Sequence, residues 1–229
     1  VPKREAVLRL VFDSISFAYQ HKNLKGHIKT SQFLFSSFSF SVEQGVLIVI
    51  WGDSGVGKTT LLKLAAGLIK PHQGFILRPQ GRISFVFQED RLLEHRSALA
   101  NVALPLEYAG FNLFFAYKHS EKLLQEVGLS HRLFHLPAEL SGGMKRRASL
   151  ARAFALSPSL LLLDEPLIGL QRKARQECLK FILSQWQEHP CPALLITHHP
   201  EEIKPQPFIR FYELKGLPAQ LREARPGNP

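Results

Sequence analysis

Apolar residues recur along the chain with two different periods, one typical of strands and one typical of helices. Residues 46–51 form a continuous apolar run, which predicts a buried strand. Leu61, Leu64, Ala65 and Leu68 then recur at helical spacing. This pattern predicts a strand, a short loop and a helix in direct succession.

Strand patterns alternate with helix patterns over most of the remaining chain. Residues 8–19 alternate well enough to predict a strand or a strand pair, and a polar, basic stretch at 21–32 predicts an exposed hairpin loop. Turn residues at 71–74 follow the first helix. Further strands are predicted at 33–42, 82–88 (ending on Gln88), 160–163 and 193–197, and further helices at 97–106, 120–127, 144–156 and 171–188. Because strands alternate with helices, we expect an α/β fold with a parallel sheet and helices on both of its faces.

The character of the chain changes at two places, which suggests internal boundaries. Strand patterns disappear between residues 89 and 139, so this stretch is predicted to be an inserted α-helical lobe. The core of a single domain would then consist of residues 1–88 and 140–214. Residues 215–229 show no apolar period and are expected to form a loose tail.

Composition excludes several classes of protein. With 229 residues, 45% hydrophobic and 21% charged, the chain is long enough for one sizeable core. Cys178 and Cys191 lack the spacing of a metal or redox pair, so we expect reduced, buried or incidental thiols of a cytosolic protein. Polar residues interrupt every long apolar stretch, so neither a signal peptide nor a membrane span is expected. The net charge of +10 suits a phosphate-rich ligand, nucleic acid, an anionic membrane or simply a basic solvated surface.

The loop after the first buried strand carries the pattern Gly52-x-x-x-x-Gly57-Lys58-Thr59. Glycines allow backbone N–H groups to turn towards phosphate oxygens, and the helix that follows adds partial positive charge. Lys58 supplies a full charge for terminal phosphates, and Thr59 offers a hydroxyl to Mg²⁺. We therefore expect a P-loop that binds ATP through Gly52, Asp53, Ser54, Gly55, Val56, Gly57, Lys58, Thr59 and Thr60.

Two adjacent carboxylates, Asp164 and Glu165, end the apolar run at 160–163. Carboxylates at the end of a buried strand are costly unless a cation or a reacting group is present. Successive side chains of a strand point apart, so Asp164 can serve the Mg²⁺ on Thr59 while Glu165 addresses a water molecule beside the terminal phosphate. A plain strand-end turn is the alternative.

A second anion site is indicated at Ser141-Gly142-Gly143, directly before the predicted helix at 144–156. A small hydroxyl and two glycines leave backbone donors open at the start of a helix. One ATP does not need two such sites, so the sequence hints at a dimer with ATP between the subunits. An ordinary helix cap is the alternative for this segment taken alone.

Taken in order, these motifs resemble those of the ATP-binding subunits of ABC transporters, over roughly residues 8–214. The P-loop is similar to Walker A, Gln88 to the glutamine loop, 140–143 to the signature, 160–165 to Walker B and His198 to the switch histidine. Tyr19 resembles the aromatic residue that stacks on adenine. The resemblance implies the ABC ATPase fold, with an antiparallel β region near the N-terminus.

The resemblance also implies roles for these residues. Glu165 is expected to be the general base, and His198 to contact the terminal phosphate and the attacking water. Gln88 is expected to bind Mg²⁺ together with Thr59 and Asp164, and to link the helical lobe to the site. Ser141, Gly142 and Gly143 would act on the ATP of a partner copy.

Four features depart from the family pattern. Gln171 stands where an aspartate usually touches the opposite subunit, and Met144 replaces the usual signature glutamine. His199 stands where an aspartate often follows the switch histidine, and the loop between Tyr19 and Phe33 is longer than usual. The first two bear on the hydrolysis rate and on coupling between sites, whereas ATP binding is expected to be unaffected.

The leading hypothesis is an ATPase subunit that drives a separate membrane permease from the cytoplasmic face of the inner membrane. Within the family, residues 87–93 resemble importers for nitrate, sulfonate and taurine, which favours import of a small solute with the help of a solute-binding protein. Alternatives are a lipid or lipoprotein export ATPase, a soluble ABC ATPase in cofactor assembly or nucleic-acid metabolism, and a regulatory module with little turnover. No nucleic-acid partner is expected.

The helical lobe holds many apolar residues for its size, which predicts a docking surface for the permease. The surface is expected at the end of the lobe nearest Gln88 and to include some of Leu92, Leu93, Leu99, Val102, Leu106 and Tyr108. The alternative is that they form the core of the lobe.

Overall fold

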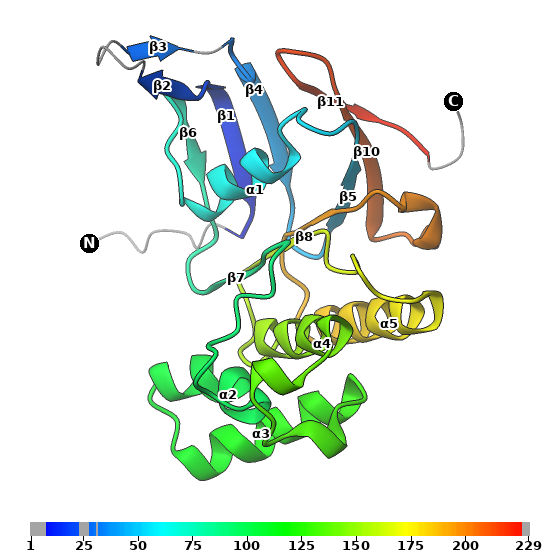
Figure 1. The fold of residues 1–229 in the computed structure, drawn as a ribbon. Coiled ribbons are helices and arrows are strands. Elements are labelled where there is room, and N and C mark those ends of the chain that lie inside the picture. The colour runs from blue at the N-terminus through cyan, green and yellow to red at the C-terminus, as the bar shows by residue number, and fades with distance from the viewer. Residues whose placement is uncertain (1–7, 23–27, 31, 226–229) are drawn as a thin grey trace, which may run out of the picture. The chain divides into compact units, whose positions relative to one another are not determined.

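The computed structural model describes residues 8–22, 28–30 and 32–225, which divide into two compact units. The first unit holds the described chain up to Ile83, the segment Ser159–Leu162 and the described chain from Cys191 onward. It contains a small antiparallel sheet and most strands of a larger one, which can be followed in Figure 1.

The small sheet is built on β1 (Leu10–Phe17), which pairs with β4 (Phe35–Val42) and with β6 (Gln73–Leu77). Ser14 has a φ of 50° and lies where both pairings shift register. A bulge of this kind changes the face of the following side chains, so Phe12 and Ile15 are both buried although they are three positions apart. The broken alternation at 8–19 is therefore one bulged strand.

The hairpin expected after Tyr19 is present as two short antiparallel strands, β2 (Gln20–Lys22) and β3 (Ile28–Thr30). Its turn lies outside the described residues, as does the predicted exposure of its side chains. The sequence-based prediction contains no strand at the position of β6, because the turn residues at 71–74 overlap the beginning of this short strand.

The larger sheet has the strand order β11-β10-β5-β9-β8-β7. Its centre is β5 (Leu47–Trp51), which runs parallel to β9 (Ala193–Ile196) and to β10 (Ile209–Lys215). β5 and β9 are buried along almost their whole length, as expected of parallel strands covered on both faces. The remaining strands are β8 (Leu160–Asp164) and β7 (Ile83–Val86), and β7 ends before Gln88 instead of on it.

Residues after Lys215 continue the larger sheet. Strand β11 (Gln220–Glu223) pairs antiparallel with β10, Leu214 faces Leu221, and Ala219 is buried. The expected loose tail is therefore wrong for the described residues up to 225. The strand is a polar edge strand held by backbone pairing, so it lacks the apolar period by which strands are recognised in a sequence.

Helix α1 (Lys58–Ala66) follows β5 and buries Leu61, Leu62, Leu64 and Ala65. It ends at Gly67, whose φ is 75°, so Leu68 lies beyond the helix and is 57% exposed. The prediction placed Leu68 on the buried face, and this is wrong. Glycine adopts the left-handed conformation that ends the helix at a lower steric cost than residues with a side chain.

The guanidinium of Arg78 lies at the C-terminal end of α1. Its Nε donates to the carbonyl of Ala65 and its Nη2 to the carbonyl of Leu64, both at 2.6 Å. These carbonyls belong to the last turn, where helices lack internal donors and carry partial negative charge. Burial lowers the pKa of Arg78 from its usual value. A side chain from the loop after β6 thus fixes the helix that follows the P-loop.

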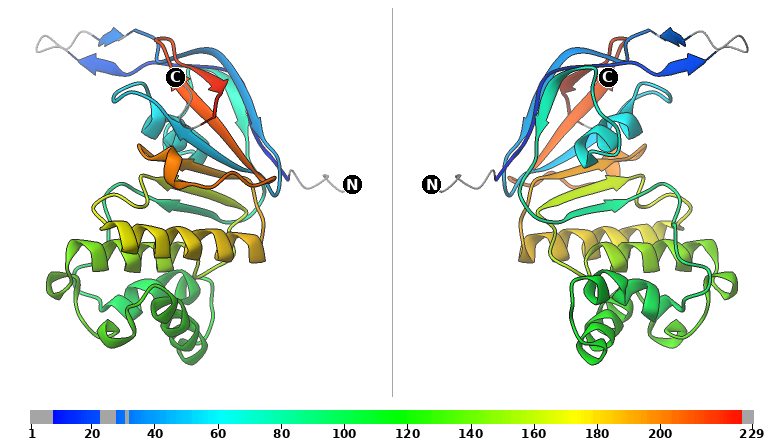
Figure 2. Two further views of the ribbon diagram at one scale, coloured as in Figure 1. Left: turned by 90° about the vertical axis from the view of Figure 1, so that its right-hand side faces the viewer. Right: turned by 90° about the vertical axis from the view of Figure 1, so that its left-hand side faces the viewer.

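The second unit consists of Ser84–Pro158 and Leu163–Pro190 and is mainly helical. Helices α2 (Ala98–Tyr108), α3 (Leu113–Glu126) and α4 (Gly142–Ala153) pack on one another, and α5 (Arg172–Glu188) runs beside α4 (Figure 2). The lobe expected at 89–139 lies within this unit. Two short 3₁₀ turns, Ser130–Arg132 and Pro137–Glu139, connect α3 to α4.

Polar side chains set where the helices of this unit begin. Ser97 caps α2 by accepting from the Ala100 N–H, and Asn112 caps α3 by accepting from the Phe115 N–H at 2.8 Å. Because of the cap at Asn112, α3 begins well before the predicted start at residue 120. The fully buried Asn101 accepts from the Leu93 N–H and donates to three carbonyls in the segment before α2.

Four of the six candidate residues for the docking surface are core residues. Leu92, Leu99, Val102 and Leu106 are all buried, whereas Tyr108 is 86% exposed. Helical spacing predicts an inward face as readily as an outward one, and here the inward face is correct. The exposed apolar side chains lie further along the chain, around the junction of α2 and α3.

Both cysteines are buried and reduced, as expected. Burial raises the pKa of the Cys178 thiol to about 11. Along the described ranges, no helix combines the length and the apolar character needed to cross a bilayer.

We predict that Arg78→Met lowers the free energy of unfolding by about 1–3 kcal/mol, because two charge-assisted bonds to the end of α1 are lost. Denaturant unfolding would measure the change. The exposed Arg82 serves as the control, and Arg82→Met should have little effect. Equal stabilities of the two variants would contradict the capping role.

Candidate nucleotide-binding site

The P-loop lies between the end of β5 and the start of α1, in the strand-loop-helix order that the sequence predicts. Gly52, Gly55 and Gly57 have φ values of 147°, 82° and 108°, which side chains rarely adopt. Gly57 is the N-cap of α1. The backbone here follows a path that only glycine takes at low cost, and the loop opens onto the N-terminal end of a helix.

The three glycines meet different surroundings. A Cβ on Gly52 would lie 2.1 Å from the backbone oxygen of Leu214 in β10, and one on Gly57 would lie 2.9 Å from Leu34 Cδ2. A Cβ on Gly55 would have no heavy atom within 4 Å. The protein therefore crowds the two ends of the loop and leaves its middle open, which is the arrangement a bound anion requires.

Lys58 is buried to 8% exposure, and its ammonium donates to the carbonyls of Gly52 at 2.7 Å and Asp53 at 2.9 Å. The side chain therefore crosses the loop and places a positive charge within it. The first turn of α1 contains no acidic residue, so no carboxylate of the helix competes for this charge. The loop presents a positive charge and open backbone donors, which suits phosphate.

Tyr19 is attached to the P-loop helix through its hydroxyl. The Tyr19 oxygen lies 3.0 Å from Thr60 Oγ1, and the ring packs edge-on against Phe17. The side chain is nevertheless 43% exposed, so one part of the ring stays available to a ligand. The sequence identified Tyr19 as a candidate, but no sequence pattern revealed the contact with Thr60.

His198 follows β9 in the first unit and is exposed. The next residue, His199, has two polar contacts: its N–H donates to Thr197 Oγ1, and its Nδ1 lies 3.1 Å from Glu201 Oε1. The unusual histidine at position 199 thus has a local partner. It leaves the expected role of His198 untouched.

In the second unit, β8 ends at the buried Asp164, which is 2% exposed, and the buried Glu165, at 8% exposure, follows it directly. Glu165 has a φ of 49°, an uncommon conformation for a residue with a side chain. Its backbone carbonyl accepts a 2.6 Å hydrogen bond from Nη2 of Arg146 in α4. Gln88 is exposed in the loop after β7. Sequence reasoning missed Arg146 because its position in the signature helix indicates no catalytic chemistry.

The start of α4 is open to solvent. Ser141 is its N-cap, accepting from the Met144 N–H, and both Ser141 and Gly142 are exposed. A Cβ on Gly142 would meet nothing within 4 Å. Gln171 occupies the N-cap of α5 and makes no capping bond with its side chain, whereas an aspartate there would be a preferred cap.

Thr59, Gln88 and Asp164 offer a hydroxyl, an amide and a carboxylate oxygen. Hard oxygen donors of this kind suit Mg²⁺, which usually keeps several waters and takes few protein ligands. No group of three or more His, Cys, Asp or Glu residues suited to a metal occurs within the described parts of the chain. As residue types, these three donors fit Mg²⁺.

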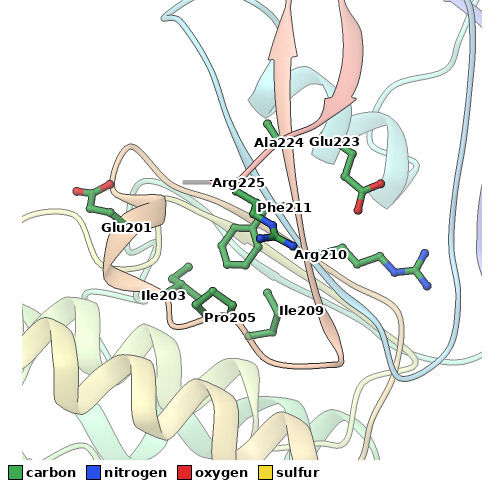
Figure 3. A pocket seen from close by; sticks show the side chains of 9 residues that line it. All are labelled: Glu201, Ile203, Pro205, Ile209, Arg210, Phe211, Glu223, Ala224 and Arg225. Atoms are coloured by element: carbon green, nitrogen blue, oxygen red, sulfur yellow. The ribbon is translucent and has the colours of Figure 1, made fainter. Parts of the chain in front are cut away.

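A separate hollow of about 880 Å³ lies in the first unit near the end of β11. Figure 3 shows its lining side chains, with Ile203, Ile209 and Phe211 as apolar members and Glu201, Arg210, Glu223 and Arg225 as charged ones. None of the residues predicted from the sequence to contact ATP lines it. It is distinct from the P-loop.

We predict that Gly52→Ala destabilises the protein by more than about 3 kcal/mol or prevents folding, because its Cβ would overlap a backbone oxygen. Gly55→Ala should cost only about 1–2 kcal/mol, since only the left-handed backbone opposes it. Chemical denaturation of both variants would test this difference. Similar losses at the two positions would contradict the crowding at Gly52.

Comparison with known proteins supplies the family. The model of the ABC transporter family matches residues 35–168. An aliphatic sulfonates import ATP-binding protein of Granulibacter bethesdensis is 40% identical, over 74% of this chain and 68% of the relative. An Fe(3+) ions import ATP-binding protein of Brucella abortus is also 40% identical, over 72% of this chain and 50% of the relative.

One of the relatives belongs to a lipoprotein-releasing system instead of an import system. A lipoprotein-releasing system ATP-binding protein of Rickettsia conorii is 32% identical, over 79% of this chain and 88% of the relative. The chain spans about half the length of the iron-import relative and about two thirds of the sulfonate-import relative.

Among solved structures, a dimeric ATP-binding cassette in a post-hydrolysis state with ADP and Pi shares the fold. Its TM-score is 0.78 at 24% identity, with 90% of this chain and 94% of that chain covered. The fold, the order of motifs and the sequence match agree, and the chain belongs to the ABC transporter family as an ATP-binding cassette.

Proposed function

We propose that this chain is the ATP-binding and ATP-hydrolysing subunit of a transporter, and that it powers a separate membrane permease. The observation that carries the proposal is the P-loop, in which left-handed glycines, the start of a helix and the Lys58 ammonium form a cradle for phosphate. A charged cradle of this kind supplies the positioning and the charge stabilisation that phosphoryl transfer requires.

The residues of the chain would share the work as follows. Lys58 and the N–H groups of the loop bind the phosphates, and the exposed face of Tyr19 stacks on adenine. Glu165 accepts the proton of the attacking water, and His198 contacts that water and the terminal phosphate. Thr59, Gln88 and Asp164 would hold Mg²⁺, which would neutralise phosphate charge.

We also propose that ATP binds between two copies of an ATP-binding subunit. Ser141 and Gly142 at the start of α4 are exposed, and a Cβ on Gly142 would have no heavy atom within 4 Å. Ser141, Gly142 and Gly143 of one copy would contact the ATP held by the P-loop of the other, in the manner of an anion at a helix N-terminus. Gln171 and Met144 are the residues at which coupling between the two sites is expected to differ from the family pattern.

Import of a small solute is the favoured direction of transport. It rests on the sulfonate-import and iron-import relatives, both 40% identical. In this scheme the subunit is peripheral on the cytoplasmic face of the inner membrane, and a solute-binding protein delivers the substrate to the permease. The lipoprotein-releasing relative is less similar, so export is the second candidate.

The permease is proposed to dock at the α2–α3 corner, which we define as Tyr108, Phe111, Leu113, Phe114 and Phe115. Their side chains are 43–86% exposed, which makes a continuous sequence segment unusually apolar for a surface. Beside them lies a pocket of about 540 Å³ lined by Leu113, Phe114, Tyr117 and Lys118 among others, which could receive an apolar side chain of the partner.

Lys58→Ala and Glu165→Gln are expected to fail in different ways. Lys58→Ala should weaken ATP binding about 10- to 100-fold, because a charge-assisted contact to phosphate is lost. Glu165→Gln should bind ATP normally, hydrolyse it about 10²–10⁴-fold more slowly and accumulate as an ATP-bound dimer. Nucleotide titration, steady-state hydrolysis and size measurement with Mg²⁺-ATP would decide. A Glu165→Gln protein that binds ATP but stays monomeric at high concentration would count against the shared site.

Phe114→Glu is expected to abolish co-purification with the permease of the same transporter, and to reduce transport at least about tenfold. ATP affinity and thermal stability should not change, because the ring is 78% exposed. Phe134 is a matched control, since it lies in the same unit, is also 78% exposed and is outside the corner. If Phe134→Glu were as damaging, or if Phe114→Glu still co-purified, the corner would not be the docking surface.

A further inference from the structure

Arg146 is the largest fully buried side chain of the described protein, with 2% exposure. It lies in α4, shortly after Ser141-Gly142-Gly143. A buried guanidinium is costly unless its donors are satisfied and its charge is compensated. The contacts that compensate this charge therefore show what the residue does.

The contacts of Arg146 join two catalytic segments of the second unit. Its Nη1 donates to the Phe87 carbonyl at 2.6 Å and to Asp90 Oδ1 at 3.3 Å. Its Nη2 donates to the Glu165 carbonyl at 2.6 Å. Phe87 and Asp90 flank Gln88 and Glu89, so one guanidinium holds both sides of the glutamine loop and the peptide that follows β8.

Charge compensation around Arg146 agrees with this arrangement. Burial lowers the pKa of Arg146, and the carboxylates of Asp90, Asp164 and Glu165 counteract that shift. Burial also raises the pKa of Asp90, which Arg146 opposes. The cation is thus kept beside the acidic end of β8 by several carboxylates rather than by a single ion pair.

The hydrogen bond from Arg146 to the Glu165 carbonyl affects the direction of the Glu165 side chain. At a φ of 49°, Glu165 is in a conformation that costs about 1–2 kcal/mol for a residue with a Cβ. Such a conformation persists only where surrounding contacts hold it, and the bond from Arg146 to the Glu165 carbonyl is one of these. Rotation of this peptide would redirect the Glu165 carboxylate.

We propose that Arg146 is the positioning residue that sets Gln88 and Glu165 for hydrolysis and links both to the signature helix. The inference rests on the proposed ATPase function. Because α4 begins at the open end that would meet the partner's ATP, a displacement of α4 is passed on through one side chain to both segments. ATP affinity should depend little on Arg146, since none of its contacts is made to the P-loop.

Two neighbouring arginines show that the role is specific. Arg147 is bonded to the carbonyls of Val127, Gly128 and Gly143, away from the glutamine loop and Glu165. Arg152 donates to the carbonyls of Asp90 and Arg91, so it supports only the far end of the glutamine loop. Arg147 is the matched control, because it lies in the same helix and makes a similar number of bonds to backbone.

The test compares Arg146→Met, Arg146→Lys and Arg147→Met in the full chain. We expect Arg146→Met to lower the maximal hydrolysis rate about 10- to 100-fold and to leave the dissociation constant for ATP within about twofold of wild type. Arg147→Met should keep most of the rate. Thermal unfolding of each variant would separate a loss of positioning from a loss of fold.

Arg146→Lys keeps the proposal testable if Arg146→Met does not fold. Lysine retains the charge, but a single ammonium does not reproduce the fork that reaches the two loops, so the variant should fold and hydrolyse slowly. A rate for Arg146→Lys equal to wild type, or parallel losses of rate and ATP affinity, would overturn the inference. Absence of hydrolysis in the wild-type dimer with its permease would instead refute the proposed function.

Discussion

The conformation of the P-loop depends on one close approach between backbones. As the chain leaves β5, Gly52 passes so near to the Leu214 carbonyl of β10 that no side chain fits. This contact fixes where the loop starts, and the left-handed Gly57 fixes where α1 begins. Tyr19 contacts Thr60 near the start of α1, and Arg78 binds carbonyls at its end, so the helix is held at both ends. Strands that are distant in the sequence thus determine the shape of a loop whose motif appears purely local.

The parts of the site that the sequence predicts are those with local causes. Apolar runs identify β5, β8 and β9, because parallel strands buried on both faces need uninterrupted apolar residues. The glycines of the P-loop can be recognised in the sequence, because other residues rarely adopt the left-handed backbone conformation. The motifs of the family supply Gln88 and His198, whose residue types alone would not have distinguished them from structural residues.

The parts that sequence reasoning missed have non-local causes. β11 is held by its pairing with β10, and its polar residues show no strand period. The early start of α3 is the exception, because its cap at Asn112 is a local contact that moves the start of the helix by several residues. For Leu99 and Val102 the sequence leaves both surface and core open, because one helix alone does not reveal which of its faces meets a neighbour. Arg146 was overlooked because its importance arises from two loops that come together only in the fold.

The buried thiols have a practical consequence. With a pKa of about 11, Cys178 is ionised in only about one molecule in ten thousand at neutral pH, and thiolates are the species that react. Cys191, the other cysteine of the sequence, is also buried. The two native thiols are therefore expected to react only slowly with maleimides. A cysteine engineered at an exposed position such as 141 would carry a fluorophore or a cross-linker without first removing the native thiols.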